Sequence, residues 1–393
     1  MKNKYRVAAA AMALALVGAA CGDDDKEGGD TTAPPATQAE IGEGEGAISI
    51  LAWPYYAENG SKDPALDWVS AFEADTGCKA TIKEFGTSDE AFTLFGSGDY
   101  DVVSASGDSS LRSVAAGNAA VINTELVDTY DDLADFLKEQ AWNSVDGIVY
   151  GVPHGWGANV LQYNTEVVDP APDSWGAVFD PESPHAGKIA AYDSPIYIAD
   201  AAVYLMATDP DLEITNPYAL DETQFDAAVE LLKAQNAILG EYWADYVQYE
   251  EHYRAGSTVM GTSWQIIVNT LTAEDPPVAV ASVLPKEGST AWSDNWMIHS
   301  EAKNPNCAYK WINYITSPAV QGTVATTFGE APANLKACDE IADHCAAYFA
   351  EDADYYGQLH YWTTPTKECL DGRTDVECKD YAEWVAAWDE IKG

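Results

Sequence analysis

The chain has 393 residues and is strongly acidic, with 20 Lys and Arg against 64 Asp and Glu and a formal net charge of −44. A negative field of this size repels other polyanions, so the composition excludes nucleic acid and anionic membrane surfaces as partners. Hydrophobic residues make up 47% of the chain, which is enough to bury large cores and excludes general disorder. The acidity fits a solvated surface suited to a salty habitat, and it also fits a field that draws in cations.

The first 46 residues are typical of an export signal followed by a tether. Residues 1–20 place basic residues before an apolar run that is too short to span a bilayer, as in a signal peptide. Small residues directly before Cys21 resemble a lipobox, which implies that Cys21 is the lipidated first residue of the mature chain; a plain secretory signal is the alternative. Residues 21–46 are acidic and rich in Gly, Pro and Thr, which predicts a flexible tether. We therefore expect an extracytoplasmic protein anchored by lipid to the cell membrane, in the periplasmic space if the cell has two membranes.

Strands and helices alternate in the first part of the folded chain. Strands are predicted near 47–53, 78–85 and 100–106, and helices near 63–77, 88–98 and 110–118. The first of these helices ends at Gly77, a natural helix stop. Such alternation predicts a mainly parallel sheet with helices on both faces, in which a ligand sits beyond the carboxyl ends of the strands.

The pattern shifts near Gly151. The segment 148–168 gives two strand-like runs broken by Pro153 and two glycines, and we expect it to cross into a second α/β lobe. That lobe has predicted strands at 188–194 and 257–264 and predicted helices at 197–207, 221–237 and 266–273; Asp221 and Gln224 resemble a capping box at the start of one helix. The segment 278–300 is predicted to cross back, before helices at 304–329. Two lobes on two crossover strands form a cleft and a hinge that closes on a ligand.

The six cysteines after Cys21 indicate disulfides, because an exported chain meets oxidising conditions. Proximity in the sequence favours Cys338–Cys345 and Cys369–Cys378, which leaves Cys78 with Cys307. The sequence alone does not choose among the possible pairings. It contains no C-x-x-C pair and no Cys/His metal spacing, so we expect neither zinc nor another cofactor.

The segment TAWSDNWMIHSEAKNP sets the carboxylate of Asp294 between Trp292 and Trp296. Two aromatic faces and an acid describe a box for an organic cation, and they equally describe a strand whose indoles pack in a core. We expect Trp296 and Trp311 to be core residues and His154 to pack at the hinge, while Trp156 is open to either role.

The order of these motifs resembles the extracytoplasmic solute-binding proteins of ABC importers, and within them the spermidine/putrescine-binding family. The segments that carry the resemblance include LAWPYYAE, YDVVSAS, AGSTVMGTSW, LPKEGSTAWSDNWMIHSEAKN and FGEAPAN. The resemblance implies a type II periplasmic-binding-protein fold, with two α/β lobes joined by two crossover strands and a ligand cleft between them. Its implied division is a first lobe at 47–152 and 288–334, a second lobe at 153–287, and disulfide-containing C-terminal helices at 335–393 that pack on the lobes.

The resemblance also implies the ligand-binding residues, which are Trp53, Tyr56, Asp108, Asp193, Tyr197, Trp264, Trp292 and Asp294. In this scheme Trp53 and Tyr56 lie at the mouth of the site, Trp264 stacks on ligand methylenes, and Asp294 beside Trp292 binds an ammonium group.

The second lobe departs from the family pattern, because Ser194 and Tyr197 stand where the family places carboxylates for the far amine. Asp108 and Asp193 are then candidates to hold the second charge, or the ligand carries a single ammonium group.

The implied function is the capture of a polyamine such as putrescine or spermidine, by a monomer that delivers it to permease subunits in the membrane. Two alternatives keep the fold and change the solute: a mono-ammonium compound such as a γ-amino acid, or ferric iron held by Tyr355 and Tyr356. A secreted enzyme is a third alternative. We do not expect an enzyme, because the sequence contains no G-x-S-x-G, H-E-x-x-H, P-loop or glycine-rich dinucleotide motif.

Overall fold

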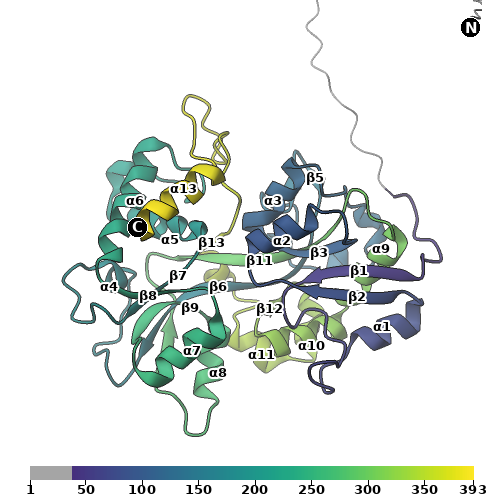
Figure 1. Cartoon of the computed structure of the whole chain (residues 1–393), viewed down its shortest axis with the longest axis horizontal. Helices are drawn as coiled ribbons and strands as arrows, with labels where there is room; N and C mark the ends of the chain where they lie inside the picture. Colours follow the sequence, from purple (N-terminus) through teal and green to yellow (C-terminus); the bar gives the residue numbers. More distant parts are fainter. Residues whose placement is uncertain (1–37) are drawn as a thin grey trace, which may run out of the picture. The chain divides into compact units, whose positions relative to one another are not determined.

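The computed structural model of the protein describes residues 38–393 (Figure 1). The predicted signal peptide, Cys21 and most of the predicted tether lie outside the described residues. The end of the tether is hydrogen-bonded to a residue of the first lobe: Gln38 Nε2 and the Gly42 N–H donate to Asn306 Oδ1 (2.7 and 2.6 Å), and Asn306 Nδ2 donates to Glu45 Oε1 (2.6 Å). Across residues 38–393, no helix combines the length and the apolar character needed to cross a membrane.

The first lobe alternates strands and helices as the sequence predicts. Its strands and helices up to the first crossing are β1 (Ala47–Ala52), α1 (Val69–Thr76), β2 (Lys79–Glu84), α2 (Ser88–Phe95), β3 (Val102–Ser106), α3 (Gly107–Ala115) and the hairpin β4 (Ser144–Val145) and β5 (Ile148–Val149). Strand β1 pairs in parallel with both β2 and β3. Gly77 ends α1 in the left-handed region (φ 73°), as predicted, and its N–H donates to the Glu73 carbonyl.

The second lobe contains the predicted elements and three that were not predicted. Its elements are α4 (Gly176–Phe179), β7 (Ile189–Tyr192), α5 (Ile198–Thr208), α6 (Glu222–Asn236), β8 (Leu239–Trp243), α7 (Tyr246–Ala255), β9 (Met260–Trp264), α8 (Gln265–Thr272) and β10 (Val280–Val283). The predicted capping box is confirmed, since the side chains of Asp221 and Gln224 each accept the backbone N–H of the other. Helix α4, strand β8 and helix α7 were not predicted, and α7 contributes to the lining of the cleft.

Two long strands, β6 (Val152–Asn164) and β11 (Ser289–Ile298), run through both lobes and pair antiparallel with each other. They join the two halves into one sheet with the order β2-β1-β3-β11-β6-β9-β7-β8 (Figure 1). The two predicted crossover strands are therefore confirmed. The predicted break at Pro153 is wrong: Pro153 lies inside β6 opposite Asn295, beside a register shift between Asp294 and Asn295. Proline is tolerated there because a bulge removes the need for its missing N–H.

The chain after β11 returns to the first lobe and then passes to the second. Its elements are α9 (Pro305–Ile315), α10 (Pro318–Phe328), β12 (Ala331–Pro332), α11 (Ala342–Ala347), α12 (Ala353–Tyr356), β13 (Leu359–Tyr361) and α13 (Tyr381–Lys392). Strand β13 pairs in parallel with β11, whereas α13 packs beside α6 in the second lobe (Figure 1).

Each lobe has a hydrophobic core on both faces of its sheet. In the first lobe Ile50 faces a core with Phe72 and Trp311, while its neighbour Leu51 faces another with Phe95. In the second lobe Ile189 and Ala191 of β7 face one core and Ala190 faces the other. Because side chains alternate along a strand, burial of both faces requires the continuous apolar runs seen in the sequence.

The predicted core aromatics are confirmed. Trp296 and Trp311 are fully buried, with ring centroids 5.5 Å apart. Trp156 is also fully buried in the first core, and His154 packs against Tyr56 and Trp296.

Three disulfides are present, and their pairing is the one that proximity favours. They are Cys78–Cys307, Cys338–Cys345 and Cys369–Cys378. The first ties helix α9 to the start of β2, so it joins parts of the first lobe that lie 229 residues apart in the chain.

Candidate functional site

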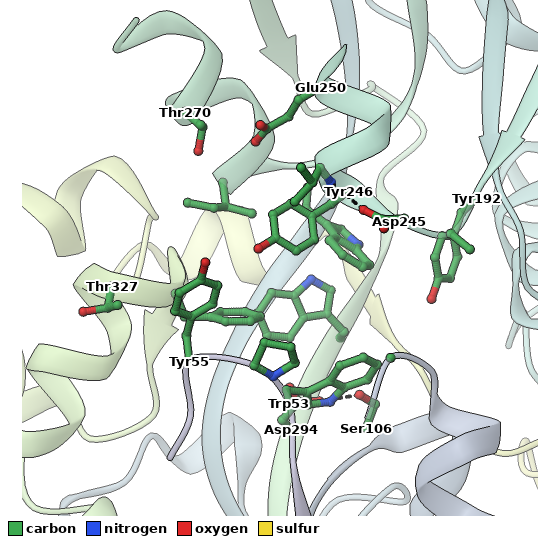
Figure 2. A pocket seen from close by; sticks show the side chains of 18 of the residues that line it. Trp53, Tyr55, Ser106, Tyr192, Asp245, Tyr246, Glu250, Thr270, Asp294 and Thr327 are labelled. Atoms are coloured by element: carbon green, nitrogen blue, oxygen red, sulfur yellow. Dashed lines mark hydrogen bonds between the residues drawn. The ribbon is translucent and has the colours of Figure 1, made fainter. Parts of the chain in front are cut away.

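A cavity of about 530 Å³ lies between the lobes, where strands of both lobes end. Trp53 follows β1 and Ser106 ends β3 in the first lobe, while Tyr192 ends β7 in the second (Figure 2). Trp264 ends β9, also in the second lobe. Ligand sites of α/β sheets form at this edge because the loops there are free to vary while the strands hold them in place.

Aromatic side chains are prominent in the walls of the cavity. They contain four tryptophans and four other aromatic rings: Trp53, Trp264, Trp292, Trp362, Tyr55, Tyr192, Tyr246 and Phe328. The remaining lining residues include the carboxylates Asp245, Glu250 and Asp294 and contain no lysine, arginine or histidine. The cavity therefore combines flat apolar surfaces with negative charge only.

Asp294 is the most buried acid in the lining, with 2% of its surface exposed. Strand β11 places it opposite Ser106 of β3, whose hydroxyl donates to Asp294 Oδ1. The Tyr56 hydroxyl donates to Oδ2 over 2.7 Å. Burial raises the pKa of Asp294 to about 7, and the two hydrogen bonds offset part of this effect. A cation bound beside it would restore the ionised form.

The turn Trp53–Tyr56 places two tyrosines in different roles. The Tyr56 N–H donates to the Trp53 carbonyl (3.2 Å), with Pro54 second in the turn and Tyr55 third, at φ 69°. Proline at the second position and a positive φ at the third are typical of a type II turn, where glycine usually takes the third place. The turn directs Tyr55 to the cavity and leaves Tyr56 fully buried behind Asp294.

Trp264 is held by a chain of hydrogen bonds that reaches the crossover strands. Its indole N–H donates to Asn159 Oδ1 (3.1 Å), and Asn159 Nδ2 donates to Thr290 Oγ1 (2.6 Å). The Thr290 hydroxyl donates to Asp200 Oδ1 (2.9 Å), and burial raises the pKa of Asp200 to about 8. The Trp264 ring also packs edge to face with Trp243, with ring centroids 5.0 Å apart. These contacts hold the Trp264 indole in place in the cavity wall.

Trp292 depends on a glycine in the neighbouring strand. A Cβ atom on Gly157 of β6 would lie 2.6 Å from the Trp292 ring, so a side chain there would displace the indole. The edge of the Trp292 ring also meets Phe328 at the end of α10, with ring centroids 5.8 Å apart.

Helix α7 supplies the second-lobe wall. Asp245 caps the helix by accepting the N–H groups of Val247 and Gln248 through Oδ1 (2.9 and 3.2 Å). Glu250 is buried; its Oε2 accepts from Arg254 (2.8 Å), and burial raises its pKa. Figure 2 shows Tyr55 and Tyr246 with their hydroxyl ends toward each other, and Glu250 and Asp294 on opposite sides of the aromatic side chains.

Comparison with protein families identifies the family of the chain. The family model for the bacterial extracellular solute-binding proteins matches residues 67–374. The chain belongs to this family.

The proteins that this solute-binding protein resembles include polyamine-binding proteins. The putrescine-binding periplasmic protein SpuD of Pseudomonas aeruginosa is 26% identical over 346 residues, which cover 84% of this chain and 89% of SpuD. The putrescine-binding periplasmic protein PotF of Escherichia coli is 25% identical over 287 residues, which cover 70% and 76% of the two chains.

Among solved structures, the spermidine/putrescine substrate-binding protein PotD of Streptococcus pneumoniae has a TM-score of 0.67 at 18% identity and covers 88% of this chain and 97% of PotD. A GABA receptor has a TM-score of 0.64 at 18% identity, covering 88% and 95%. These structural likenesses show the predicted two-lobed fold.

The structure brings together five of the residues expected to form the site of this solute-binding protein. Trp53, Trp264, Trp292 and Asp294 line the cavity, and Tyr56 contacts Asp294 from behind. The expectation that Tyr56 lies at the mouth does not fit its complete burial; its neighbour Tyr55 lies in the lining instead.

Three expected residues lie outside the lining. Asp193 Oδ1 accepts from Trp388 Nε1 (3.0 Å) and Lys392 Nζ (2.7 Å) of α13, so its charge is already paired. Tyr197 is buried in a core of the second lobe, where Gln235 donates to its hydroxyl (3.0 Å). Asp108 is buried in the first turn of α3 and accepts from Ser88 (2.9 Å); burial raises its pKa to about 6.

Four lining residues that the sequence did not indicate come from an unpredicted helix and from the tail. Asp245, Tyr246 and Glu250 belong to α7 or precede it, and Trp362 directly follows β13. The sequence signal that could have located Asp245 is its position as a helix cap, since Asp is a favoured N-cap residue.

The ferric-iron alternative finds no support at its tyrosines. Tyr356 stacks on Phe136 (3.9 Å between centroids) and Tyr355 on Phe349 (4.1 Å), and neither lines the cavity. Within residues 38–393 no group of three His, Cys, Asp or Glu side chains is placed to hold a metal ion.

Proposed function

We propose that this solute-binding protein captures a polyamine in the cavity between its lobes and delivers it to the permease of an ABC importer. The observation that carries the proposal is the lining itself, with four tryptophans, three carboxylates and no cationic side chain. The putrescine-binding relatives support the same solute class.

The chemistry of the lining suits an alkylammonium chain. An ammonium group over an indole face gains roughly 0.5–2 kcal/mol, more as water is excluded. A charge-assisted hydrogen bond to Asp294 adds about 1.5–3 kcal/mol. The methylenes between the amines gain about 0.8 kcal/mol each when aromatic walls bury them. Each part of a polyamine therefore meets a complementary surface.

We assign one ammonium group to Asp294 and the far one to the α7 wall. Glu250 Oε2 is engaged by Arg254, so only Oε1 is free for a ligand, while Asp245 keeps Oδ2 free of the helix cap. Asp245 takes the role that we expected of Asp193, whose charge is paired with Lys392; Glu250 is itself paired with Arg254 and adds only its free Oε1.

A γ-amino acid fits this cavity less well than a polyamine. Its carboxylate would be buried without a cationic partner, because the lining contains no lysine, arginine or histidine. It would also lie among three acids of like charge. We therefore favour the polyamine over the mono-ammonium alternative.

The cellular setting follows from the proposed role. Lipidation of Cys21, followed by the tether predicted for residues 21–46, would hold the protein at the outer face of the membrane, beside its permease. We propose that it acts as a monomer, binds its solute without converting it, and closes its two lobes on the ligand. A ligand that touches both lobes binds the closed form better and shifts the population towards it.

Titration calorimetry with putrescine, spermidine, γ-aminobutyrate and ferric citrate tests the proposal. We expect at least one of the two polyamines to bind tightly and the other two compounds to give no saturable heat. Tight binding of γ-aminobutyrate or ferric citrate without polyamine binding would overturn it.

A further inference from the structure

Behind the cavity, two buried carboxyl groups share one hydroxyl. The Tyr56 oxygen lies 2.7 Å from Asp294 Oδ2 and 2.7 Å from Glu330 Oε2. Tyr56 and Glu330 are fully buried, and Asp294 is 2% exposed. Glu330 precedes β12 and does not line the cavity.

The number of hydrogens decides how these groups are protonated. A tyrosine hydroxyl has one hydrogen and can donate it along only one of the two short contacts. If both carboxyl groups were ionised, the other contact would set two oxygens with lone pairs against each other at hydrogen-bond distance. One of the two carboxyl groups must therefore carry a proton and donate it to the Tyr56 oxygen.

The surroundings assign that proton to Glu330. Asp294 has a second donor, the Ser106 hydroxyl, and faces the cavity where a cation can reach it. Among residues 38–393, Glu330 has no second donor: its Oε1 makes no hydrogen bond and lies 3.5 Å from His154 Nε2. In the part of the chain that the structure describes, no lysine or arginine nitrogen lies within 4 Å of Glu330. Its carboxyl group is pressed against Gly155, where a Cβ atom would lie 2.2 Å away.

We infer that Glu330 is a positioning residue of the polyamine site, a neutral acid that donates to Tyr56 so that Tyr56 must donate to Asp294. The protonation of Glu330 does not depend on the proposed function. Its consequence does, because Asp294 is then the single anionic group that receives the polyamine at this end of the cavity. Glu330 then fixes the Asp294 carboxylate for one ammonium group without adding a second charge.

The other groups around Glu330 are consistent with a neutral acid. On β6, burial lowers the pKa of His154 to about 3, so its ring is neutral. On α11, the His344 Nε2 atom lies 2.7 Å from the Glu330 carbonyl oxygen, and burial also lowers the pKa of His344. Tyr348, directly after α11, has its pKa raised to about 12 by burial and is neutral as well. Burial raises the pKa of Glu330 itself well above its ordinary value.

Glu330→Gln tests the inference, because glutamine keeps the shape and an N–H donor but cannot ionise. We expect its putrescine affinity at pH 8 to stay within about threefold of wild type, with the same pH profile, since the hydrogen bond to Tyr56 is retained. Glu330→Met, which cannot donate, should bind at least about tenfold more weakly. If Glu330 were an ionised receptor, Glu330→Gln would lose as much affinity as Glu330→Met, and that result would overturn the inference.

A ligand-free measurement separates this inference from the proposed function. Infrared spectra of the wild-type protein at pH 8 should contain the C=O stretch of a protonated carboxyl group that is lost in Glu330→Gln. If the variant does not fold, a pH titration of the wild-type protein should still show a carboxyl band that persists above the range in which both Asp294 and Asp200 titrate. Absence of such a band at pH 8 would overturn the inference, even if polyamines bind. Failure of every amine to bind would overturn the proposed function and leave the infrared result intact.

Discussion

Replacing Asp294 with asparagine should weaken ligand binding without lowering the stability of the fold. The change removes the negative charge but keeps the size of the side chain, so one charge-assisted hydrogen bond to the ligand is lost. A loss of about 1.5–3 kcal/mol corresponds to about 10- to 150-fold weaker putrescine binding. Without ligand, Asp294→Asn should melt at or above the wild-type temperature at pH 8, because the pKa of Asp294 is raised to about 7 and ionising it inside the protein is unfavourable.

The pH dependence makes this prediction sharper. Since the ammonium group needs the ionised carboxylate, wild-type affinity should rise as pH rises through about 7, by about tenfold between pH 6 and pH 8. The Asp294→Asn variant should lack this rise. Calorimetry at both pH values measures the effect, and Asp193→Asn is the matched control, because Asp193 is paired with Lys392 outside the cavity lining. Equal affinity of wild type and Asp294→Asn at pH 8 would refute the reasoning.

Three further predictions concern aromatic stacking, buried acids and the disulfides. Trp264→Ala should weaken the binding of every polyamine tested by about 5- to 30-fold, whereas Trp264→Phe should retain most of the affinity because it keeps an aromatic face. Equal losses of affinity in the two variants would refute stacking of the ligand on this ring. Without ligand, thermal stability should fall as pH rises from about 6.5 to 8.5, because the raised pKa values of Asp294 (about 7) and Asp200 (about 8) make the native state hold more protons than the unfolded state in that window. Asp200→Asn should flatten this slope. A rise in thermal stability over the same pH range would contradict the prediction. Replacing Cys78 and Cys307 with serine should lower the free energy of unfolding by about 5 kcal/mol, whereas replacing Cys338 and Cys345 should lower it by about 2 kcal/mol, because the two disulfides close loops of 229 and 7 residues. Denaturant titration measures both losses, and equal losses would contradict the loop-length argument.

The fold was predictable because most of its strands are buried on both faces. Ile50 and Leu51 are adjacent in the chain and enter different cores, so the strand appears in the sequence as an unbroken apolar run. The elements that were missed lack such a pattern. Strand β8 has the sequence LGEYW and helix α7 the sequence YVQYEEHYRA, and in both the polar residues interrupt the apolar period.

The candidate site was predictable where its residues share one short motif. Trp292 and Asp294 lie two positions apart on β11, so both were found together. The error at Asp193 is a shift of one residue: Tyr192 lines the cavity, while the Asp193 side chain bonds to α13. Trp362 could not be placed, because only the pairing of β13 with β11 brings the tail to the cavity. Nothing in the sequence distinguishes Glu330 from a surface acid, since its burial depends on tertiary packing around Tyr56.

A crystal structure of the protein with putrescine tests the central claim most directly. We predict one ammonium nitrogen about 2.8 Å from an Asp294 oxygen, the methylenes against Trp264 and Trp292, and the second nitrogen beside Asp245 or Glu250. Putrescine bound elsewhere on the acidic surface, with the cavity between the lobes left without it, would contradict the account.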